Sequence, residues 1–164
     1  MYSKRSKTSN ASLRITIISV GKWRRGPNQD LFNTYTKRLS WEVRLLEIQE
    51  GAKLQVSQRK NQEGIKLISA LPDKAKVVVL DQSGKAFTSV EFADNLRNWR
   101  DIGDRELAFI IGGADGLHRN VLEKANLILS LSSMTWPHML VRAMLAEQLW
   151  RAASIINNHP YHRL

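Results

Sequence analysis

The order of apolar and polar positions along the chain predicts strands that alternate with helices. Apolar, β-branched runs predict strands at residues 13–20, 43–48, 76–81, 107–111 and 128–131. Helical spacing of apolar residues predicts helices at about 30–39, 57–71, 90–99, 120–125 and 140–156. Such alternation favours an α/β fold, an open and mostly parallel sheet with helices on both faces.

Two of the predicted strands, 76–81 and 107–111, are apolar at nearly every position, which is typical of strands buried on both faces of a parallel sheet. In open sheets of this kind, ligands bind at the carboxyl ends of the strands. Three loops begin at such ends, after Leu80, after Ile111 and after Leu131. We expect these loops to converge on one small molecule. A turn is predicted at residues 82–85.

The last predicted helix follows a polar loop that contains a proline and precedes an aromatic and basic tail. Along it, Leu145, Leu149 and their neighbours keep helical spacing, whereas Arg142 falls among the other positions, which favours a surface salt bridge or a substrate contact. The tail, residues 157–164, suits stacking on bases and pairing with phosphates. A disordered polar end is the alternative.

Composition indicates one domain that binds a polyanion. The chain has 164 residues, 43% of them hydrophobic, which suits a single core. Its net charge is +10, and residues 1–40 hold nine Lys or Arg against the single acid Asp30. Lys22 and Arg24 lie in this basic stretch, as nucleic-acid binding requires. An anionic membrane is the competing polyanion, but no run approaches ~18 apolar residues.

Several classes of site are disfavoured. The chain has no cysteine, which excludes disulfides and thiolate chemistry. Its four histidines form no HExxH motif, and we expect no metal. Residues 1–12 are basic and free of acids, which leaves a transit peptide as an alternative to the flexible basic extension that we expect. Residues 13–164 are predicted to form the single domain.

The three loops offer the groups that an adenine nucleotide needs. The glycines of residues 112–116 allow close backbone approach, although a simple tight turn explains them equally. Asp81 suits a ribose contact or a turn cap. In the loop before the last helix, Met134 and Trp136 supply an apolar wall beside hydroxyl groups. The residues alone therefore indicate a nucleotide-like binder that acts on nucleic acid.

Segments of the chain resemble the RlmH family of the SPOUT methyltransferase superfamily. They are residues 109–117, 129–152 and 158–163, supported by 15–23 and 79–89. The resemblance covers about residues 13–164 and implies a C-terminal trefoil knot, a homodimer and a cytoplasmic enzyme. It implies methyl transfer from S-adenosylmethionine to N3 of a pseudouridine in large-subunit (23S) ribosomal RNA, on the assembled ribosome.

The resemblance also assigns residues to roles. The implied cofactor contacts are Leu80, Gly112, Leu131, Ser132, Ser133, Met134, Thr135 and Trp136. The residues expected at the RNA are Lys22, Arg24, Arg142, Tyr161, His162 and Arg163. His162 is the candidate base and Arg142 a candidate catalytic cation, because a pyrimidine N3 must lose its proton to become a good nucleophile. A non-catalytic ribosome-binding or assembly factor and a transfer-RNA methyltransferase are the rival hypotheses.

Overall fold

The computed structural model describes residues 12–51 and 53–163 and shows five strands in one parallel sheet. The strands are β1 (Arg14–Val20), β2 (Glu42–Ile48), β3 (Lys76–Ala86), β4 (Glu106–Ile111) and β5 (Leu127–Ser130). The helices are α1 (Pro27–Arg38), α2 (Val56–Ser69), α3 (Ser89–Ile102), α4 (Arg119–Leu122) and α5 (His138–Ile156). The strand order is β2-β1-β4-β3-β5, with every pairing parallel. The α/β fold predicted from the sequence is confirmed.

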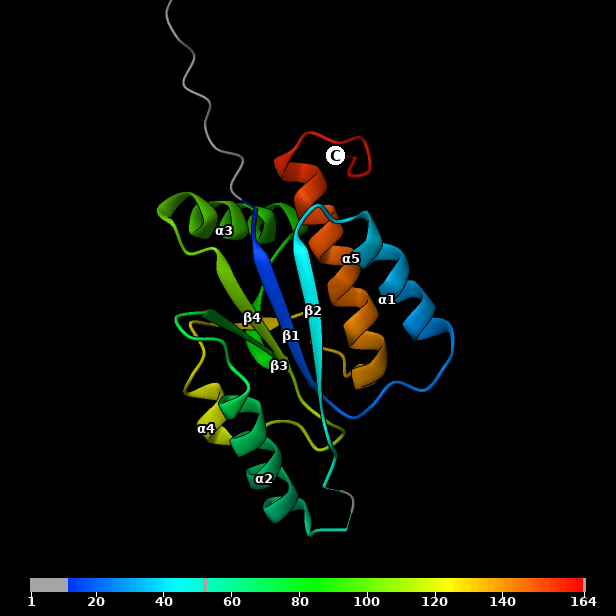
Figure 1. Cartoon of the computed structure of the whole chain (residues 1–164), viewed down its shortest axis with the longest axis vertical. Coiled ribbons are helices and arrows are strands. Elements are labelled where there is room, and N and C mark those ends of the chain that lie inside the picture. The colour runs from blue at the N-terminus through cyan, green and yellow to red at the C-terminus, as the bar shows by residue number, and fades with distance from the viewer. Residues whose placement is uncertain (1–11, 52, 164) are drawn as a thin grey trace, which may run out of the picture.

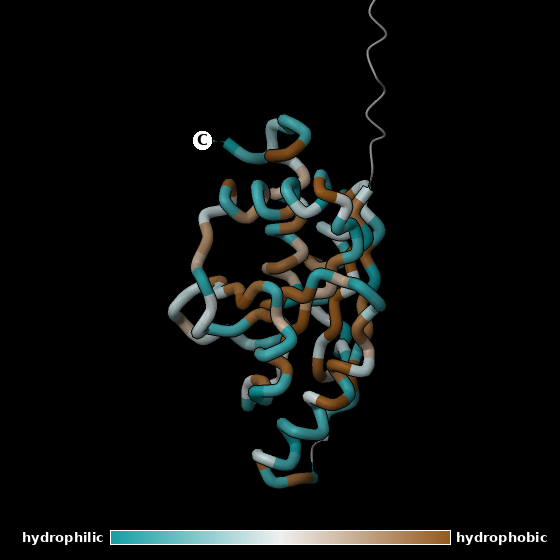
Figure 2. Tube along the Cα trace, turned by 90° about the vertical axis from the view of Figure 1, so that its left-hand side faces the viewer, coloured by the Kyte–Doolittle hydropathy of each residue, from teal (hydrophilic) through white to brown (hydrophobic). Residues whose placement is uncertain are grey.

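Helices cover both faces of the sheet, as predicted (Figure 1). Alternation along β1 sends Ile15 and Ile17 into a core shared with α1, α3 and α5, and sends Ile18 and Val20 into a second core under α2 and α4. Figure 2 shows hydrophobic stretches running through the middle of the molecule, with hydrophilic residues on the outer turns. Both faces of the central strands are therefore buried, which explains their nearly continuous apolar sequences.

The turn predicted at residues 82–85 is wrong. The chain stays extended there as part of β3, and its register against β5 shifts between Leu80 and Lys85. A side chain at Gly84 could not fit, because a Cβ there would lie 2.6 Å from the carbonyl oxygen of Ile128. The glycine therefore marks a close approach of two strands instead of a tight turn.

Helix ends differ from the sequence prediction by a few residues. α1 begins at Pro27, ahead of the predicted start, because proline is well suited to a first helical turn. α3 begins after a capping box formed by Thr88 and Glu91, and ends at Gly103, which has a φ of +99°. α4 is shorter than predicted and has four residues.

Some expectations lie beyond what the fold decides. The trefoil knot stays a prediction, because strand order and pairing do not define a knot. The proposed basic extension lies outside the described residues except for Ser12. No helix in residues 12–51 and 53–163 is both long and apolar enough to cross a bilayer.

Candidate functional site

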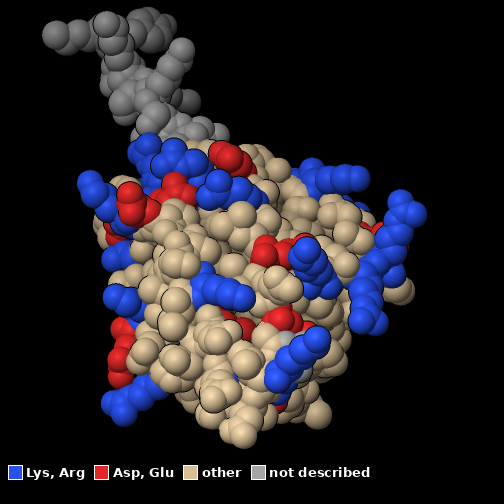
Figure 3. All heavy atoms as spheres, turned by 60° about the horizontal axis from the view of Figure 1, so that its bottom comes forward, with Lys and Arg blue, Asp and Glu red and all other residues tan. Residues whose placement is uncertain are grey.

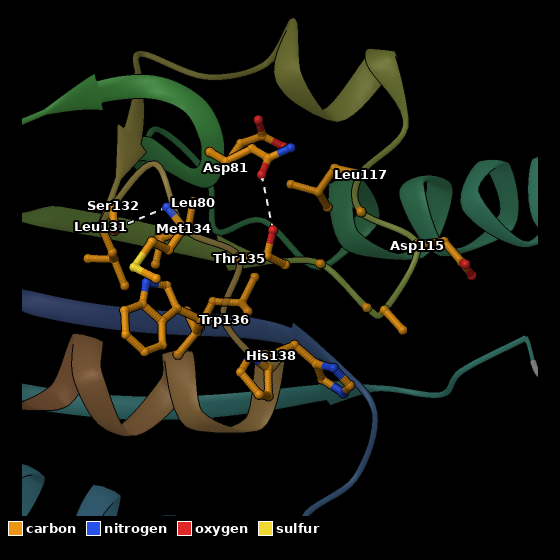
Figure 4. A pocket seen from close by; sticks show the side chains of 18 of the residues that line it. Leu80, Asp81, Asp115, Leu117, Leu131, Ser132, Met134, Thr135, Trp136 and His138 are labelled. Carbon is orange, nitrogen blue, oxygen red and sulfur yellow. Dashed lines mark hydrogen bonds between the residues drawn. The ribbon is translucent and has the colours of Figure 1, made fainter.

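A cavity of about 700 Å³ opens at the carboxyl ends of β4 and β5, beside residues 80–82 of the longer strand β3. β4, β3 and β5 lie side by side and run in parallel, so the loops that follow β4 and β5 meet at one edge of the sheet, next to the register shift of β3. Figure 4 shows side chains from these segments around the cavity, with the first turn of α5 closing one side. The loops predicted after Ile111 and Leu131 are therefore brought together where open parallel sheets bind ligands, whereas the segment after Leu80 lines the cavity as part of β3.

The loop after β4 forms a tightly packed wall of the cavity. A Cβ at Gly112 would lie 2.9 Å from Cδ2 of Leu117, and a Cβ at Gly113 would lie 3.1 Å from Cγ1 of Val20. Gly116 has a φ of +77°, which favours glycine, and its N–H donates to the Gly113 carbonyl at 3.1 Å. The glycines therefore allow a tight turn and close packing in the same loop, which are the two roles that the sequence left open.

The loop after β5 forms the opposite, more open wall. The N–H of Met134 donates to Oγ of Ser132 at 3.0 Å, which shapes the loop, and Thr135 Oγ1 donates to Oε1 of Gln82 at 3.4 Å, which links it to β3. The side chains of Met134 and Trp136 are 67% and 38% exposed and lie next to each other in Figure 4. An exposed apolar pair at the mouth of a cavity is suited to cover a flat ring.

Most of the predicted cofactor residues line this cavity. They are Leu80, Gly112, Leu131, Ser132, Met134, Thr135 and Trp136. Ser133 is exposed and does not line it. Asp81 lines the cavity and also accepts hydrogen bonds from Ser83 N at 2.9 Å and Ser83 Oγ at 2.6 Å through Oδ1, so this oxygen is already bonded within β3. The roles of these residues toward a cofactor remain predictions.

His138 was not predicted to line the cavity, and nothing in the sequence pattern marks it. It is the first residue of α5 and is half-buried. Burial lowers its pKa, and the nearby positive charge of Arg142 lowers it further. The neutral imidazole is therefore favoured beside the cavity.

Arg142 is completely buried, which corrects its predicted place on the outer positions of the helix. Its Nε donates to Ser19 Oγ at 2.8 Å and its Nη1 to Glu47 Oε1 at 3.0 Å. Its Nη2 donates to the carbonyls of Val20 at 2.8 Å and Gly21 at 2.6 Å. Burial lowers the pKa of the guanidinium, which the Glu47 carboxylate partly offsets. A side chain so enclosed is neither a surface ion pair nor exposed to RNA.

The basic loop between β1 and α1 begins beside the cavity. A Cβ at Gly21 would lie 3.4 Å from Nε2 of His138, so the loop starts against the first turn of α5. Lys22 and Arg24 are exposed, whereas the Trp23 ring turns inward and lies 4.7 Å from the Arg142 guanidinium carbon. Lys22 and Arg24, both predicted to bind RNA, are therefore placed at the same edge of the sheet as the cavity. Figure 3, which turns the bottom of the molecule forward, shows Lys and Arg side chains spread over its surface with Asp and Glu among them.

The described part of the C-terminal tail folds back on the last turns of α5. Tyr161 donates through its hydroxyl to Glu147 Oε1 at 2.9 Å, and the Arg151 guanidinium carbon lies 5.0 Å from the Tyr161 ring centre. Burial and the hydrogen bonds to Tyr35 and Glu147 raise the pKa of Tyr161. His162 Nδ1 lies 3.4 Å from Arg151 Nη1, and Arg163 is exposed.

The tail and the cavity lie at opposite ends of α5. The helix has 19 residues, and at ~1.5 Å per residue it separates the two by roughly 28 Å. In Figure 1 the C-terminus lies at the far end of α5 from the carboxyl edge of the sheet. Within one chain, His162 therefore cannot reach a molecule in the cavity.

The chemistry open to the site is that of an organic ligand. In residues 12–51 and 53–163, no group of three or more His, Asp or Glu side chains is placed to hold a metal ion. The cavity instead offers a glycine wall, an apolar rim and loop hydroxyls. These groups suit a purine ring and a ribose, and they can hold a reacting group in a fixed orientation.

Comparison with known proteins finds a family and relatives that match nearly the whole chain. The family described as "Predicted SPOUT methyltransferase" matches residues 13–162. A curated relative from Paramagnetospirillum magneticum, named "Ribosomal RNA large subunit methyltransferase H", is 54% identical over 92% of this chain and 99% of its own length. A relative of the same name from Rhodospirillum centenum is 44% identical over the same shares.

Among solved structures, one similar chain is a putative methyltransferase from Legionella pneumophila in complex with the bound cofactor SAM. The alignment has a TM-score of 0.49 and 14% identity, and covers 86% of this chain and 66% of that one. Similarity at this level adds nothing to the functional argument.

Proposed function

The chain belongs to the SPOUT methyltransferase family, and from this membership we propose that it is an S-adenosylmethionine-dependent methyltransferase of large-subunit ribosomal RNA. In the finer form of the proposal, the methyl group goes to N3 of a pseudouridine on the assembled ribosome. The observation that carries the proposal is the family match over residues 13–162 together with a cavity built from the loops after β4 and β5 and from residues 80–82 of β3.

The cavity fits S-adenosylmethionine on structural grounds. Gly112 and Gly113 line the cavity without side chains, so backbone atoms can approach a ligand there. Met134, Trp136 and Leu131 provide apolar surface for an adenine, and Asp81 is placed for a ribose hydroxyl. The cofactor supplies a methyl group on a positively charged sulfur. The neutral state of His138 favours this cation, because a protonated imidazole would repel it.

The chain's own residues must orient the RNA and accept a proton. When the N–CH3 bond forms and the S–CH3 bond breaks, the N3 proton leaves the pyrimidine ring. We assign its removal to His162, with Tyr161 and Arg163 of the same tail contacting the RNA. Lys22 and Arg24, exposed beside the cavity, bind phosphates. Arg142 acts by positioning Gly21 and α5, since its buried guanidinium cannot touch the substrate.

This assignment requires a homodimer. His162 lies at the far end of α5 from the cavity of its own chain, so it can serve only the cavity of a second copy. The described part of α5 supports this arrangement, because Leu140 and Met144 remain partly exposed on a face that no other element covers fully. We expect one protomer to supply the cofactor cavity and its partner to supply the tail.

The deciding experiment measures transfer of labelled methyl from S-adenosylmethionine to three substrates: assembled ribosomes that lack the modification, naked ribosomal RNA and bulk transfer RNA. The labelled nucleotide is then mapped. We expect label only on a pseudouridine of the assembled ribosome. Label on transfer RNA would refute the substrate, and cofactor binding without any transfer would favour the non-catalytic ribosome factor.

The dimer is tested by complementation. A variant that lacks the tail from Tyr161 onward is mixed with a Gly112→Arg variant, each inactive alone. In a shared-site dimer, mixing restores part of the activity, because the mixed dimer combines one intact cavity with one intact tail. Activity that stays absent after subunit exchange has been verified would overturn the shared site.

A further inference from the structure

Helix α2 lies behind the glycine-rich wall of the cavity and does not line the cavity itself. Its residues Arg59 and Glu63 are one helical turn apart and share one face. Both reach the segment Gly113–Asp115, which forms part of the cavity wall. In Figure 4 Asp115 is directed away from the labelled residues of the opposite wall. α2 therefore contacts from behind the loop that a cofactor would contact from the front.

Arg59 provides the first contact. Its Nη2 forms an ion pair with Oδ2 of Asp115, and the side chains are 19% and 32% exposed, so water screens this pair less than a fully exposed one. The aliphatic part of Arg59 is also enclosed, since a Cβ at Gly51 would lie 3.3 Å from its Cγ. The guanidinium is thereby held in one place, which makes it a fixed anchor for Asp115.

Glu63 provides the second contact. Its side chain is buried, and Oε1 accepts a hydrogen bond from the N–H of Gly51 at 3.2 Å. Its other oxygen, Oε2, lies 3.5 Å from the place where a Cβ of Gly113 would be. A carboxylate buried at this position is costly to desolvate.

The loop needs such restraint because glycine is conformationally free. Gly112, Gly113 and Gly116 leave the loop with more accessible backbone states than any other residue type would allow, and ordering those states costs free energy when a ligand binds. A loop already held in its binding conformation avoids that cost.

We propose that Arg59 and Glu63 are positioning residues: α2 holds the Gly112–Gly116 loop in the conformation that the cofactor binds. The identity of the ligand rests on the proposed function, whereas the restraint on the loop does not. Arg59 acts through Asp115, and Glu63 acts through Gly113 and the chain at Gly51.

The first test is hydrogen exchange of the backbone amides of residues 112–117 in the full chain without ligand. Arg59→Met should accelerate this exchange, whereas Lys66→Met, which removes an exposed cation from the same helix, should leave it unchanged. The same two variants are then titrated with S-adenosylhomocysteine by calorimetry. We expect Arg59→Met to weaken binding about five-fold or more, the range of coupling between residues in contact.

A charge exchange separates positioning from general destabilisation. Arg59→Asp and Asp115→Arg should each accelerate exchange and weaken binding, and the double variant should recover both, because the ion pair is rebuilt with reversed polarity. Additive effects in the double variant, or exchange in Arg59→Met equal to that in Lys66→Met, would overturn the inference. If the unmodified chain binds no S-adenosylhomocysteine, the proposed cofactor is wrong, and the exchange data still decide whether α2 restrains the loop.

Discussion

Replacing Arg142 by methionine probes the most heavily bonded side chain of the described core. Methionine has a similar length and keeps much of the packing, but it cannot donate a hydrogen bond. The substitution removes the donors to Ser19, Glu47 and the two carbonyls that end β1. Those acceptors are buried or partly buried, and Glu47 Oε1 keeps one other donor, the N–H of Trp23 at 2.6 Å.

The magnitude follows from what is left unpaired. Removing one partner of a buried charge pair costs about 3–5 kcal/mol, because the remaining charge keeps its desolvation penalty. Glu47 is 28% exposed, so water can rehydrate it in part, which favours the lower end of that range. The unpaired carbonyls of Val20 and Gly21 act in the opposite direction, at about 1–3 kcal/mol for each acceptor that water does not reach. We therefore expect a loss of about 3–5 kcal/mol in the free energy of unfolding.

The assay is urea unfolding followed by fluorescence and circular dichroism. With a slope near ~2 kcal/mol per molar, the midpoint should fall by about 1.5–2.5 M. The urea midpoint of Arg142→Lys should lie between those of the unmodified chain and Arg142→Met, since one ammonium cannot serve all four acceptors. Arg119→Met is the control, because its pair with Glu123 is exposed and should contribute little. An Arg142→Met midpoint equal to that of Arg119→Met, together with loss of methylation, would refute the positioning role. It would indicate instead that Arg142 contacts the substrate directly.

Three further predictions concern the cavity and the tail. Gly112→Ala should weaken S-adenosylhomocysteine binding about ten-fold or more in calorimetry, because its Cβ would meet Leu117 at 2.9 Å. The control Gly26→Ala, whose Cβ meets only a carbonyl at 3.9 Å, should bind normally. Equal affinities of the two variants would contradict the cavity assignment. Deletion of the tail from Tyr161 onward should spare cofactor binding and abolish methyl transfer, and methylation that survives it would remove His162 from the chemistry. Because burial and Arg142 lower the pKa of His138, its neutral form is favoured on folding, and stability should fall as pH drops below 6.5 toward that lowered pKa. S-adenosylmethionine affinity depends on the folded chain and should fall only as pH drops through the lowered pKa of His138 itself. His138→Asn should flatten both profiles, and a pH dependence unchanged in that variant would assign it to another group.

The strands could be predicted from the sequence because burial on both faces leaves a direct trace in composition. Residues 76–81 and 107–111 read as buried strands, and the structure places them next to each other in the sheet. The convergence of the loops after Ile111 and Leu131 on one cavity followed from the same argument, since parallel strands end at a common edge, whereas the segment after Leu80 lines the cavity as part of β3. The extension of β3 past Leu80 could not be predicted, because it depends on how closely β5 passes over Gly84.

Arg142 shows why the site was predicted less well than the fold. It lies at helical spacing with Leu145, Leu149 and Ala152, all buried, so position alone would have placed it inside. A search for apolar residues passes over it because it is charged. Its acceptors come from β1 and β2, more than 90 residues away, and no local pattern can show that they are present.

The ends of the parallel strands explain why the cavity stops where it does. At the carboxyl end of a strand the last carbonyls have no further ladder partner, and they must be paired by protein, water or ligand. After β4 and β5 these ends open on the cavity, beside the register shift of β3. After β1 they are taken by the guanidinium of Arg142, which Trp23 covers from outside. One edge of the sheet is thus divided into a part that is open to a ligand and a part closed by the protein itself. Gly21 and His138 form the boundary between them. A change at Arg142 should therefore extend the cavity toward β1 as well as destabilise the fold, and the two effects are separable by measuring ligand affinity at a urea concentration where the variant is still folded.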